Sequence, residues 1–289
     1  MAVQVGPAIA VTELARPSAD LERIEVALLL EGIYQHYGFD FRGYAWASLR
    51  RRLWSRALAE GVKSLSALQE RVLHDPAAME RLLHDLSINV TSMFRDPTFF
   101  AAFREKVVPL LRTYPFVRIW NAGCSTGEET YSLAIILREE GLYDRARIYA
   151  TDINDRVLEH ARSASYPLDR MRDYTENYIR SGGSESFSAY YQADGETARF
   201  DPSLLDQIVF AQHNLASDSA FNHFNVIVCR NVMIYFGKAL QDRVHDLFYD
   251  SLETFGVLAL GHKESMRFTG HEKRYEELDA QEKLYRKVR

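Results

Sequence analysis

Cysteine is scarce in this chain of 289 residues, which has only Cys124 and Cys229. No C-x-x-C and no H-E-x-x-H motif occurs, so the sequence indicates neither a disulfide framework nor a zinc site. It also lacks an apolar run of the ~18 residues that a membrane span needs, and no basic residue precedes Arg16 to mark a secretory signal. We therefore expect a soluble, cytoplasmic protein without a metal and without membrane insertion.

Positive charge is also in deficit, with 35 Lys+Arg against 40 Asp+Glu and a net charge of −5. This balance argues against a nucleic-acid-coating surface. Residues 41–59 nevertheless carry five arginines and no acid, so the rest of the chain holds −10, since −5 = +5 − 10. We interpret this segment as a docking face for an acidic partner; a merely solvated helix and a nucleic-acid patch are the alternatives. The arginines that we expect to dock the partner are Arg50, Arg51, Arg52 and Arg56, with Arg42 nearby.

The first part of the chain has helical patterns only. Residues 1–19 have two prolines and no periodicity, which predicts a flexible tail. Gly38, Gly61 and the Asp-Pro pairs at 75–76 and 96–97 separate stretches with apolar residues at helical spacing. We predict an all-α domain over 20–113, with Asp20 and Asp96 as helix caps and with helices at 20–37, 44–60, 64–73, 76–86 and 96–113.

After Pro115 short β-rich segments alternate with helical ones, which predicts a doubly wound α/β domain over 114–289 with a parallel sheet. A stretch at about 167–203 breaks the alternation. It contains a predicted hairpin, 187–192 and 197–200, around Ala-Asp-Gly-Glu, and we interpret it as a small inserted antiparallel β-subdomain. The predicted strands of the main sheet are 116–121, 147–151, 207–212, 224–229 and 257–260, and the helices are 128–139, 155–164 and 238–253.

The turn after the first strand indicates a ligand. Gly123 and Gly127 follow 116–121 in a G-x-x-x-G spacing, which is neither the dinucleotide motif nor a P-loop, and no lysine follows to meet a phosphate. Glu128 and Glu129 instead open the helix, where they would repel a pyrophosphate and attract an ammonium group. The alternative is that both only complement the helix dipole.

Asp152 ends the second predicted strand, at the position where this architecture holds a ribose diol. Capping of the next helix by Asp152 or Asn154 is the alternative. A nucleoside with a cationic, phosphate-free group is S-adenosylmethionine, so we expect that cofactor. Asn214, Asn231 and Tyr235 follow later strands and are expected at the same sheet edge.

Six motifs, taken in order along the chain, resemble the CheR-type chemoreceptor glutamate O-methyltransferases. They are Asn89-Val-Thr91-Ser-Met-Phe-Arg95-Asp, Asn121-Ala-Gly-Cys-Ser-Thr-Gly-Glu-Glu129-Thr-Tyr-Ser, Ala150-Thr-Asp152, Asn214-Leu215, Cys229-Arg-Asn-Val-Met-Ile-Tyr235-Phe and Gly261-His-Lys-Glu-Ser265. The resemblance runs from about residue 20 to the C-terminus. It implies a class I methyltransferase domain with a Rossmann-like sheet, an inserted β-subdomain and a preceding helical domain.

The resemblance also implies roles for single residues. Arg95 and Tyr235 would lie beside the reactive methyl group as catalytic residues. One departure from the family pattern is Thr130, where proline is usual; we expect a small local change and retained binding. The implied cofactor contacts are Asn89, Thr91, Arg95, Gly123, Glu129, Asp152, Asn214, Leu215, Arg230 and Asn231.

The implied activity is methyl transfer from S-adenosylmethionine to glutamate carboxylates of a chemoreceptor's cytoplasmic helices, leaving S-adenosylhomocysteine. A glutamate of pKa near 4.3 is already ionised near pH 7, so no general base is required. The receptor's C-terminal tail is a further partner that some family members hold on the inserted hairpin. Two rival interpretations are a cofactor-binding signalling adaptor without turnover and a methyltransferase for small molecules or nucleic acid.

Overall fold

The computed structural model describes residues 18–87 and 89–288. The expected tail over 1–19 lies outside the described residues except for its last two positions. Ser18 caps the first helix by accepting a hydrogen bond from the N–H of Leu21 at 3.2 Å. The predicted cap, Asp20, instead lies in the first turn of that helix.

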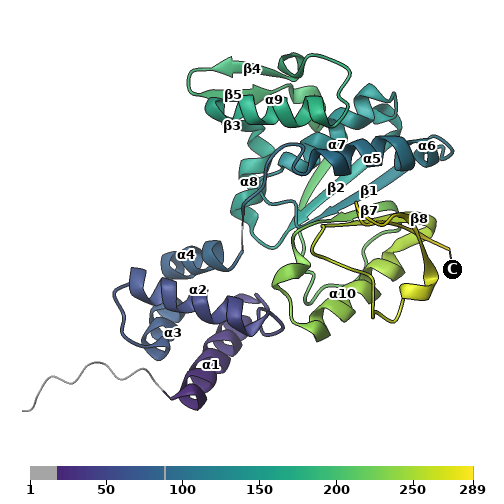
Figure 1. Cartoon of the computed structure of the whole chain (residues 1–289). Coiled ribbons are helices and arrows are strands. Elements are labelled where there is room, and N and C mark those ends of the chain that lie inside the picture. The colour runs from purple at the N-terminus through teal and green to yellow at the C-terminus, as the bar shows by residue number, and fades with distance from the viewer. Residues whose placement is uncertain (1–17, 88, 289) are drawn as a thin grey trace, which may run out of the picture.

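Four helices form the group at the N-terminal end of the chain, set apart from the sheet in Figure 1. Apolar side chains from all four share one core, which includes Leu29, Leu53, Leu68 and Leu82. The helices are α1 (Ala19–Tyr37), α2 (Trp46–Ala59), α3 (Leu65–His74) and α4 (Pro76–Leu86).

The segment after α4 is predicted from the sequence as one helix of this domain. The structure differs from this prediction in the continuity of the helix and in the core to which its side chains belong. The segment consists of α5 (Pro97–Ala102), a π-helical turn η1 (Phe103–Val107) and α6 (Val108–Leu111). The break lies beside Pro109, which has no N–H to continue the α-helical hydrogen bonds. Its apolar side chains, such as Phe99 and Phe103, belong to the core that lies against the sheet. We therefore propose that the domain boundary lies between α4 and α5 and not near residue 113.

The described part of the second domain contains a seven-stranded sheet in the order β6-β2-β1-β7-β8-β10-β9. The first five strands of this order are parallel, and β10 and β9 are antiparallel additions. The strand order reverses between β1 and β7, which is where this architecture binds its ligand. The strands are β1 (Val117–Ala122), β2 (Ala146–Asp152), β6 (Ile208–Gln212), β7 (Phe224–Cys229), β8 (Leu252–Leu260), β9 (Tyr275–Asp279) and β10 (Leu284–Lys287).

Helices cover both faces of the sheet, as predicted for a doubly wound fold. Figure 1 shows α5 and α7 (Glu128–Glu139) on one face and α10 (Lys238–Ser251) on the other. Successive residues of β7 divide between two cores: Val226 and Val228 pack with α7, and Ile227 packs with α10. Helix α8 (Asp155–Ser163) follows β2, and short 3-10 turns are η2 (Tyr143–Arg145), η5 (Pro202–Leu205), η6 (Met233–Tyr235) and η7 (Glu272–Arg274).

The predicted insertion is present as a three-stranded antiparallel sheet in the order β3-β5-β4. Residues 187–190 were predicted to begin the hairpin but form the 3-10 turn η4 (Phe187–Tyr190), so that the first hairpin strand starts at Tyr191. The elements are β3 (Ser165–Pro167), η3 (Leu168–Arg170), α9 (Met171–Arg180), β4 (Tyr191–Asp194) and β5 (Thr197–Phe200).

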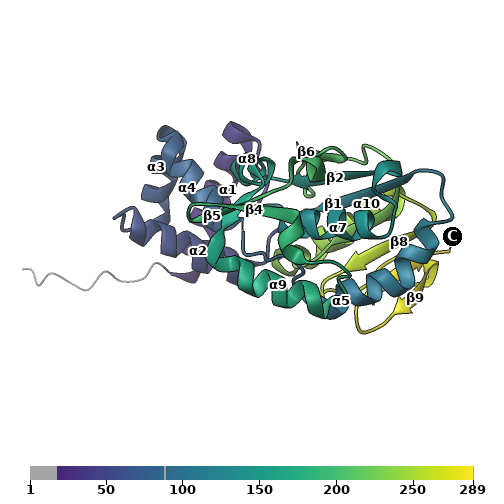
Figure 2. The same ribbon diagram turned by 90° about the horizontal axis from the view of Figure 1, so that it is seen from above.

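The two domains touch through the loop before α2. Tyr44 forms an isolated β-bridge with Phe236, and the N–H of Ala45 donates to the carbonyl of Tyr235 at 2.9 Å. Seen from above in Figure 2, α1–α4 lie at one end of the molecule and the sheet at the other. Within the described ranges, no helix has the length and apolarity that crossing a bilayer requires.

Candidate functional site

A cavity opens at the carboxyl ends of β1, β2 and β7, under the segment that joins α4 to α5. The empty space in it is about 870 Å³ when the solvent at its open mouth is counted. Every predicted catalytic and cofactor residue lines it. These residues are Asn89, Thr91, Arg95, Gly123, Glu129, Asp152, Asn214, Leu215, Arg230, Asn231 and Tyr235.

The turn after β1 brings the backbone close to the opposite wall. Gly123 has φ +75°, and a Cβ built on it would lie 2.5 Å from Cγ2 of Val232. Only glycine fits this conformation and this contact without displacing the neighbour. Gly127, with φ +95°, then starts α7 at Glu128. The two glycines that the sequence singled out therefore form the turn as predicted.

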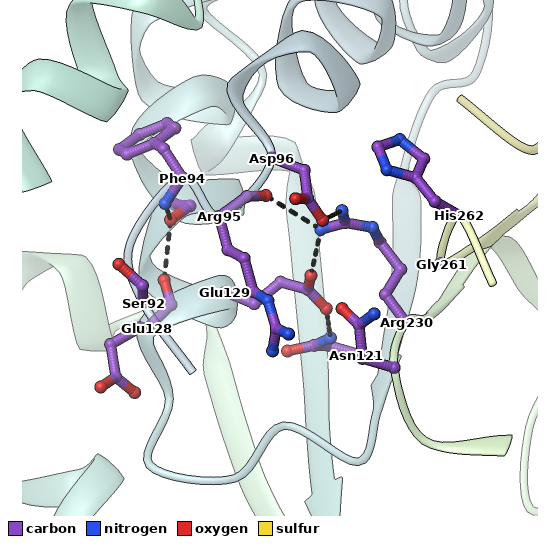
Figure 3. Close-up of polar contacts among 12 residues, drawn as sticks. Ser92, Phe94, Arg95, Asp96, Asn121, Glu128, Glu129, Arg230, Gly261 and His262 are labelled. Carbon is purple, nitrogen blue, oxygen red and sulfur yellow. Dashed lines mark hydrogen bonds and ion pairs between the residues drawn. The ribbon is translucent and has the colours of Figure 1, made fainter. Parts of the chain in front are cut away.

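Glu129 is held by two donors in the first turn of α7 (Figure 3). Its Oε1 accepts from Nδ2 of Asn121 at 2.8 Å, and its Oε2 lies 2.8 Å from Nη1 of Arg230. The hydroxyl of Thr130 donates to Oδ1 of Asn121 at 2.6 Å and so orients the amide nitrogen toward Glu129. A carboxylate has about four acceptor positions, so Glu129 can still accept hydrogen bonds from an ammonium group.

The side chain of Arg230 is fully buried between two carboxylates. Besides Glu129, its guanidinium contacts Oδ2 of Asp96 at 2.7 Å and the carbonyl of Arg95 at 3.3 Å, and it stacks on Phe99 at 3.9 Å. Asp96 was predicted to cap α5, but its side chain makes no capping hydrogen bond and pairs with Arg230 instead. We propose that Arg230 supports Glu129 from behind, since both of its Nη groups are directed to these partners.

Asp152 is buried at the cavity wall. Its two oxygens accept from the backbone N–H groups of Ser125 at 2.9 Å and Asn154 at 3.0 Å. Burial raises the pKa of Asp152, and these N–H groups oppose the shift. Asn154 caps α8 through the N–H of Arg156 at 3.1 Å, so the capping role falls to Asn154 and leaves Asp152 for a ligand.

Three polar atoms near Asp152 are buried without a partner among the described residues, namely Oγ of Ser125, Nδ1 of His213 and Nδ2 of Asn214. All three residues line the cavity beside Leu215. Buried polar groups are normally hydrogen-bonded, so these atoms indicate a ligand that is polar on this side. Two carboxylates, three unpartnered polar atoms and an apolar contact at Leu215 suit a nucleoside with a cationic group, and the residues present therefore fit S-adenosylmethionine.

Arg95 and Tyr235 line the cavity from two different segments of the chain. The guanidinium of Arg95 donates to the carbonyl of Val90 at 2.8 Å, which ties it to the covering segment. Tyr235 lies in η6, and its ring is stacked against Arg52, whose Cζ is 4.7 Å from the ring centre. The hydroxyl of Tyr235 has no hydrogen-bond partner in the described part of the chain, so it is available to a ligand.

The predicted docking arginines differ from one another. Arg52 is buried, donates to the carbonyl of Leu86 at 2.6 Å and faces Tyr235, so it contacts residues of the cavity wall and does not lie on an open surface. Burial lowers the pKa of Arg52. Arg50 pairs with Glu22 at 2.7 Å and Arg56 with Asp85 at 2.6 Å. Arg51 is exposed and forms no ion pair with any described residue.

Several residues contribute to the site although the sequence did not assign them to it. Asn121 and Asp96 were in the quoted motifs, but their part in holding Glu129 and Arg230 depends on contacts between distant segments. The position of Arg52 under Tyr235 had no sequence signal, because a run of arginines does not show which of them turns inward. Other unpredicted residues of the cavity wall are Tyr44, Ser125, Ile153, His213, Val232 and Phe236.

The fold and the cavity together define a class I S-adenosylmethionine-dependent methyltransferase. Comparison with known families agrees: residues 89–284 match the model described as "CheR methyltransferase, SAM binding domain", and residues 24–87 match "CheR methyltransferase, all-alpha domain". The chain belongs to the CheR methyltransferase family.

Curated relatives cover most of the chain. It is 50% identical over 264 residues to a protein of Pseudomonas putida named "Putative methyltransferase Cher3", a match that covers 91% of this chain and 97% of that one. It is 30% identical to the "Chemotaxis protein methyltransferase" of Salmonella typhimurium, over 81% of each chain. The protein of the same name in Escherichia coli is 29% identical, over 84% of each chain.

Proposed function

We propose that this methyltransferase transfers the methyl group of S-adenosylmethionine to glutamate side chains of a chemoreceptor-type signalling protein. The observation that carries the proposal is the convergence of Arg95, Tyr235, Glu129 and Asp152 on one cavity, in a chain whose relatives include chemotaxis protein methyltransferases. When bound, S-adenosylmethionine supplies an electrophilic methyl group. Residues of this chain would bind the cofactor and position the acceptor carboxylate.

Each residue has a distinct task in this proposal. Glu129 would bind the ammonium group of the cofactor, and Asp152 would bind its ribose hydroxyls. Arg95 would bind and orient the incoming glutamate carboxylate. The hydroxyl of Tyr235 would hold an oxygen of the cofactor or of the substrate by a hydrogen bond. The acceptor is already ionised near neutral pH, so positioning and exclusion of water supply the rate enhancement.

We propose that the receptor residues around the methylated glutamate dock on α2. Arg51 is exposed without an ion pair, and the side chain of Arg50 remains 46% exposed beside Glu22. These two guanidinium groups could bind the acidic residues that flank a receptor methylation site. We also propose that β4, the edge strand of the inserted sheet in the order β3-β5-β4, can accept a receptor tail by strand addition.

The test is transfer of a tritiated methyl group from the cofactor to candidate receptor fragments, followed by alkali treatment. A glutamate methyl ester releases labelled methanol, whereas methylated amines and nucleobases do not. The control is Tyr235→Phe, which removes only the hydroxyl and is expected to lower turnover far more than the affinity for S-adenosylhomocysteine. Alkali-stable label would refute the ester, and the absence of transfer to every fragment would favour the adaptor without turnover.

A further inference from the structure

The loop after β7 carries much of the site and has an unusual backbone. Residues 230–235 include Arg230, Asn231 and Tyr235, all of which line the cavity. Asn231 has φ +63°, in the left-handed region, which asparagine adopts more readily than most non-glycine residues. The conformation still costs free energy, so contacts that stabilise it help to fix the loop.

Glu264 supplies that stabilisation from the other side of the loop. Its Oε1 accepts from the backbone N–H groups of Val232 at 2.9 Å and Met233 at 2.8 Å. Its Oε2 accepts from the N–H groups of Asn231 at 3.0 Å and Gly261 at 2.6 Å. All four contacts are to backbone, and three come from consecutive residues, an arrangement that forms a concave anion site.

The contact requires a close approach of two segments. A Cβ built on Gly261 would lie 2.8 Å from the N of Asn231 and 2.8 Å from Oε2 of Glu264. Glycine at 261 therefore lets the strand end after β8 meet the loop after β7, with the carboxylate between them. The loop after β7 and the segment after β8 each contain one of the sequence motifs quoted above. The spacing of residues within these motifs does not predict that the two segments meet.

The charge of Glu264 matters to this arrangement. The side chain is buried, and no salt bridge joins it to a cation of the described residues. Burial raises the pKa of its carboxyl, and the four N–H groups oppose that shift. A protonated carboxyl would direct an O–H at one of these donors, whereas the carboxylate accepts from all four.

We propose that Glu264 is a positioning residue, whose carboxylate fills the backbone anion site of residues 231–233 and thereby holds Asn231 and Tyr235 in their places at the cavity. It acts through the loop and does not touch the reacting groups. The inference deepens the proposed function, because the loop that it fixes carries the residue assigned to align the methyl transfer.

The first experiment compares Glu264→Gln with Glu282→Gln. Glu282 lies in the same C-terminal segment and pairs with His262 at the surface. In Glu264→Gln the amide nitrogen faces two N–H donors, so the loop must shift. We expect turnover to fall about a hundredfold, since a misplacement of roughly 1 Å can cost that much, while Glu282→Gln keeps wild-type turnover.

The second readout does not depend on any methyl acceptor. The backbone amide protons of Asn231, Val232 and Met233 should resonate downfield in the NMR spectrum of the wild-type protein, because they donate to a charged group. In Glu264→Gln these signals should move upfield, and S-adenosylhomocysteine should bind about tenfold more weakly. If these spectral and binding changes occur while no receptor fragment is methylated, the proposed substrate fails and the role of Glu264 stands.

A third variant separates positioning from general stabilisation. Glu264→Ala leaves room for a small anion, and added formate should restore S-adenosylhomocysteine affinity and the downfield amide signals, whereas chloride at equal ionic strength should not. Unshifted amide signals in the wild-type protein, or wild-type affinity and turnover in Glu264→Gln, would overturn the proposal. The wild-type spectrum tests whether the carboxylate of Glu264 binds the three amides, even where a variant does not fold.

Discussion

The arginines of α2 and the arginine after β7 show how different the surroundings of one residue type can be. Arg50 and Arg56 lie on the helical domain, in ion pairs that water reaches. Arg230 lies between the domain linker and the sheet, with no exposed side-chain surface, two carboxylate partners and a phenylalanine ring below it. Exposed ion pairs are worth little, whereas breaking a buried one leaves an uncompensated charge.

Arg52 differs in burial from its direct neighbour in the same helix. It follows Arg51 directly in the chain, yet it is buried against Tyr235 while Arg51 is exposed. Consecutive helical residues point about 100° apart, so one faces the methyltransferase domain and the other faces solvent. The local charge of +5 therefore contains residues with different tasks.

The largest effect is expected from Arg230→Met compared with Arg50→Met. The first change leaves Asp96 and Glu129 without their cation and should lower the free energy of unfolding by about 3–5 kcal/mol. The second should lower it by less than about 1 kcal/mol. Urea denaturation of both variants measures the difference, and equal losses would contradict a greater contribution of the buried ion pairs to stability.

His245 is a buried basic residue that, unlike Arg230, forms no ion pair with a described carboxylate. His245 on α10 is buried, and its pKa is lowered to about 4. Burial is the main cause, Lys238 and His271 contribute to the lowering, and Asp242 and Asp246 oppose it. The unfolded chain binds a proton near pH 6.5 and the folded protein only near pH 4, so stability is full above pH 6.5 and falls as the pH drops toward 4. His245→Phe should lose less unfolding free energy between pH 7 and pH 5 than the wild type; parallel losses would show that His245 is not responsible.

Variants of the neighbouring residues Arg51 and Arg52 should affect different steps, substrate docking and catalysis respectively. Arg52→Met removes the charge over the Tyr235 ring, worth about 1–2 kcal/mol, and should lower kcat roughly tenfold with little change in KM for a receptor fragment. Arg51→Met should instead raise KM, with an effect that fades at high salt. Steady-state kinetics at two salt concentrations tests both, and a KM effect of Arg52→Met alone would reverse the assignment.

The smallest expected effect is at Thr130. Thr130→Val removes the hydroxyl that orients Asn121, a loss of about 1 kcal/mol, and should weaken S-adenosylhomocysteine binding about fivefold by calorimetry. The matched control is Thr126→Val, because the hydroxyl of Thr126 donates to Glu128, which does not line the cavity. Equal affinity in both variants would mean that the Asn121 amide keeps its orientation without Thr130.

Much of the fold could be predicted from local patterns. Strand and helix alternation after Pro115 indicated the parallel sheet, and the glycine turn placed Gly123 and Gly127 correctly. The C-terminal hairpin of β9 and β10 was missed, because Glu276 and Glu277 break the apolar alternation in an edge strand. The segment over 96–113 has its buried side chains in the core against the sheet and not in the core of α1–α4, which the sequence did not predict, since an amphipathic pattern shows that one face is buried but not against what.

The sequence by itself determined the order of elements, the residues at the strand ends and, through the motifs, the family and its cofactor. Those features depend on local backbone preferences and on neighbours within one turn or strand. Only the tertiary structure decided that Arg230 supports Glu129, that Arg52 turns toward Tyr235 and that Glu264 closes on the loop at 231–233. Each of these contacts joins segments far apart in the chain, and burial, which decides whether a charge must have a partner, exists only once the domains have packed.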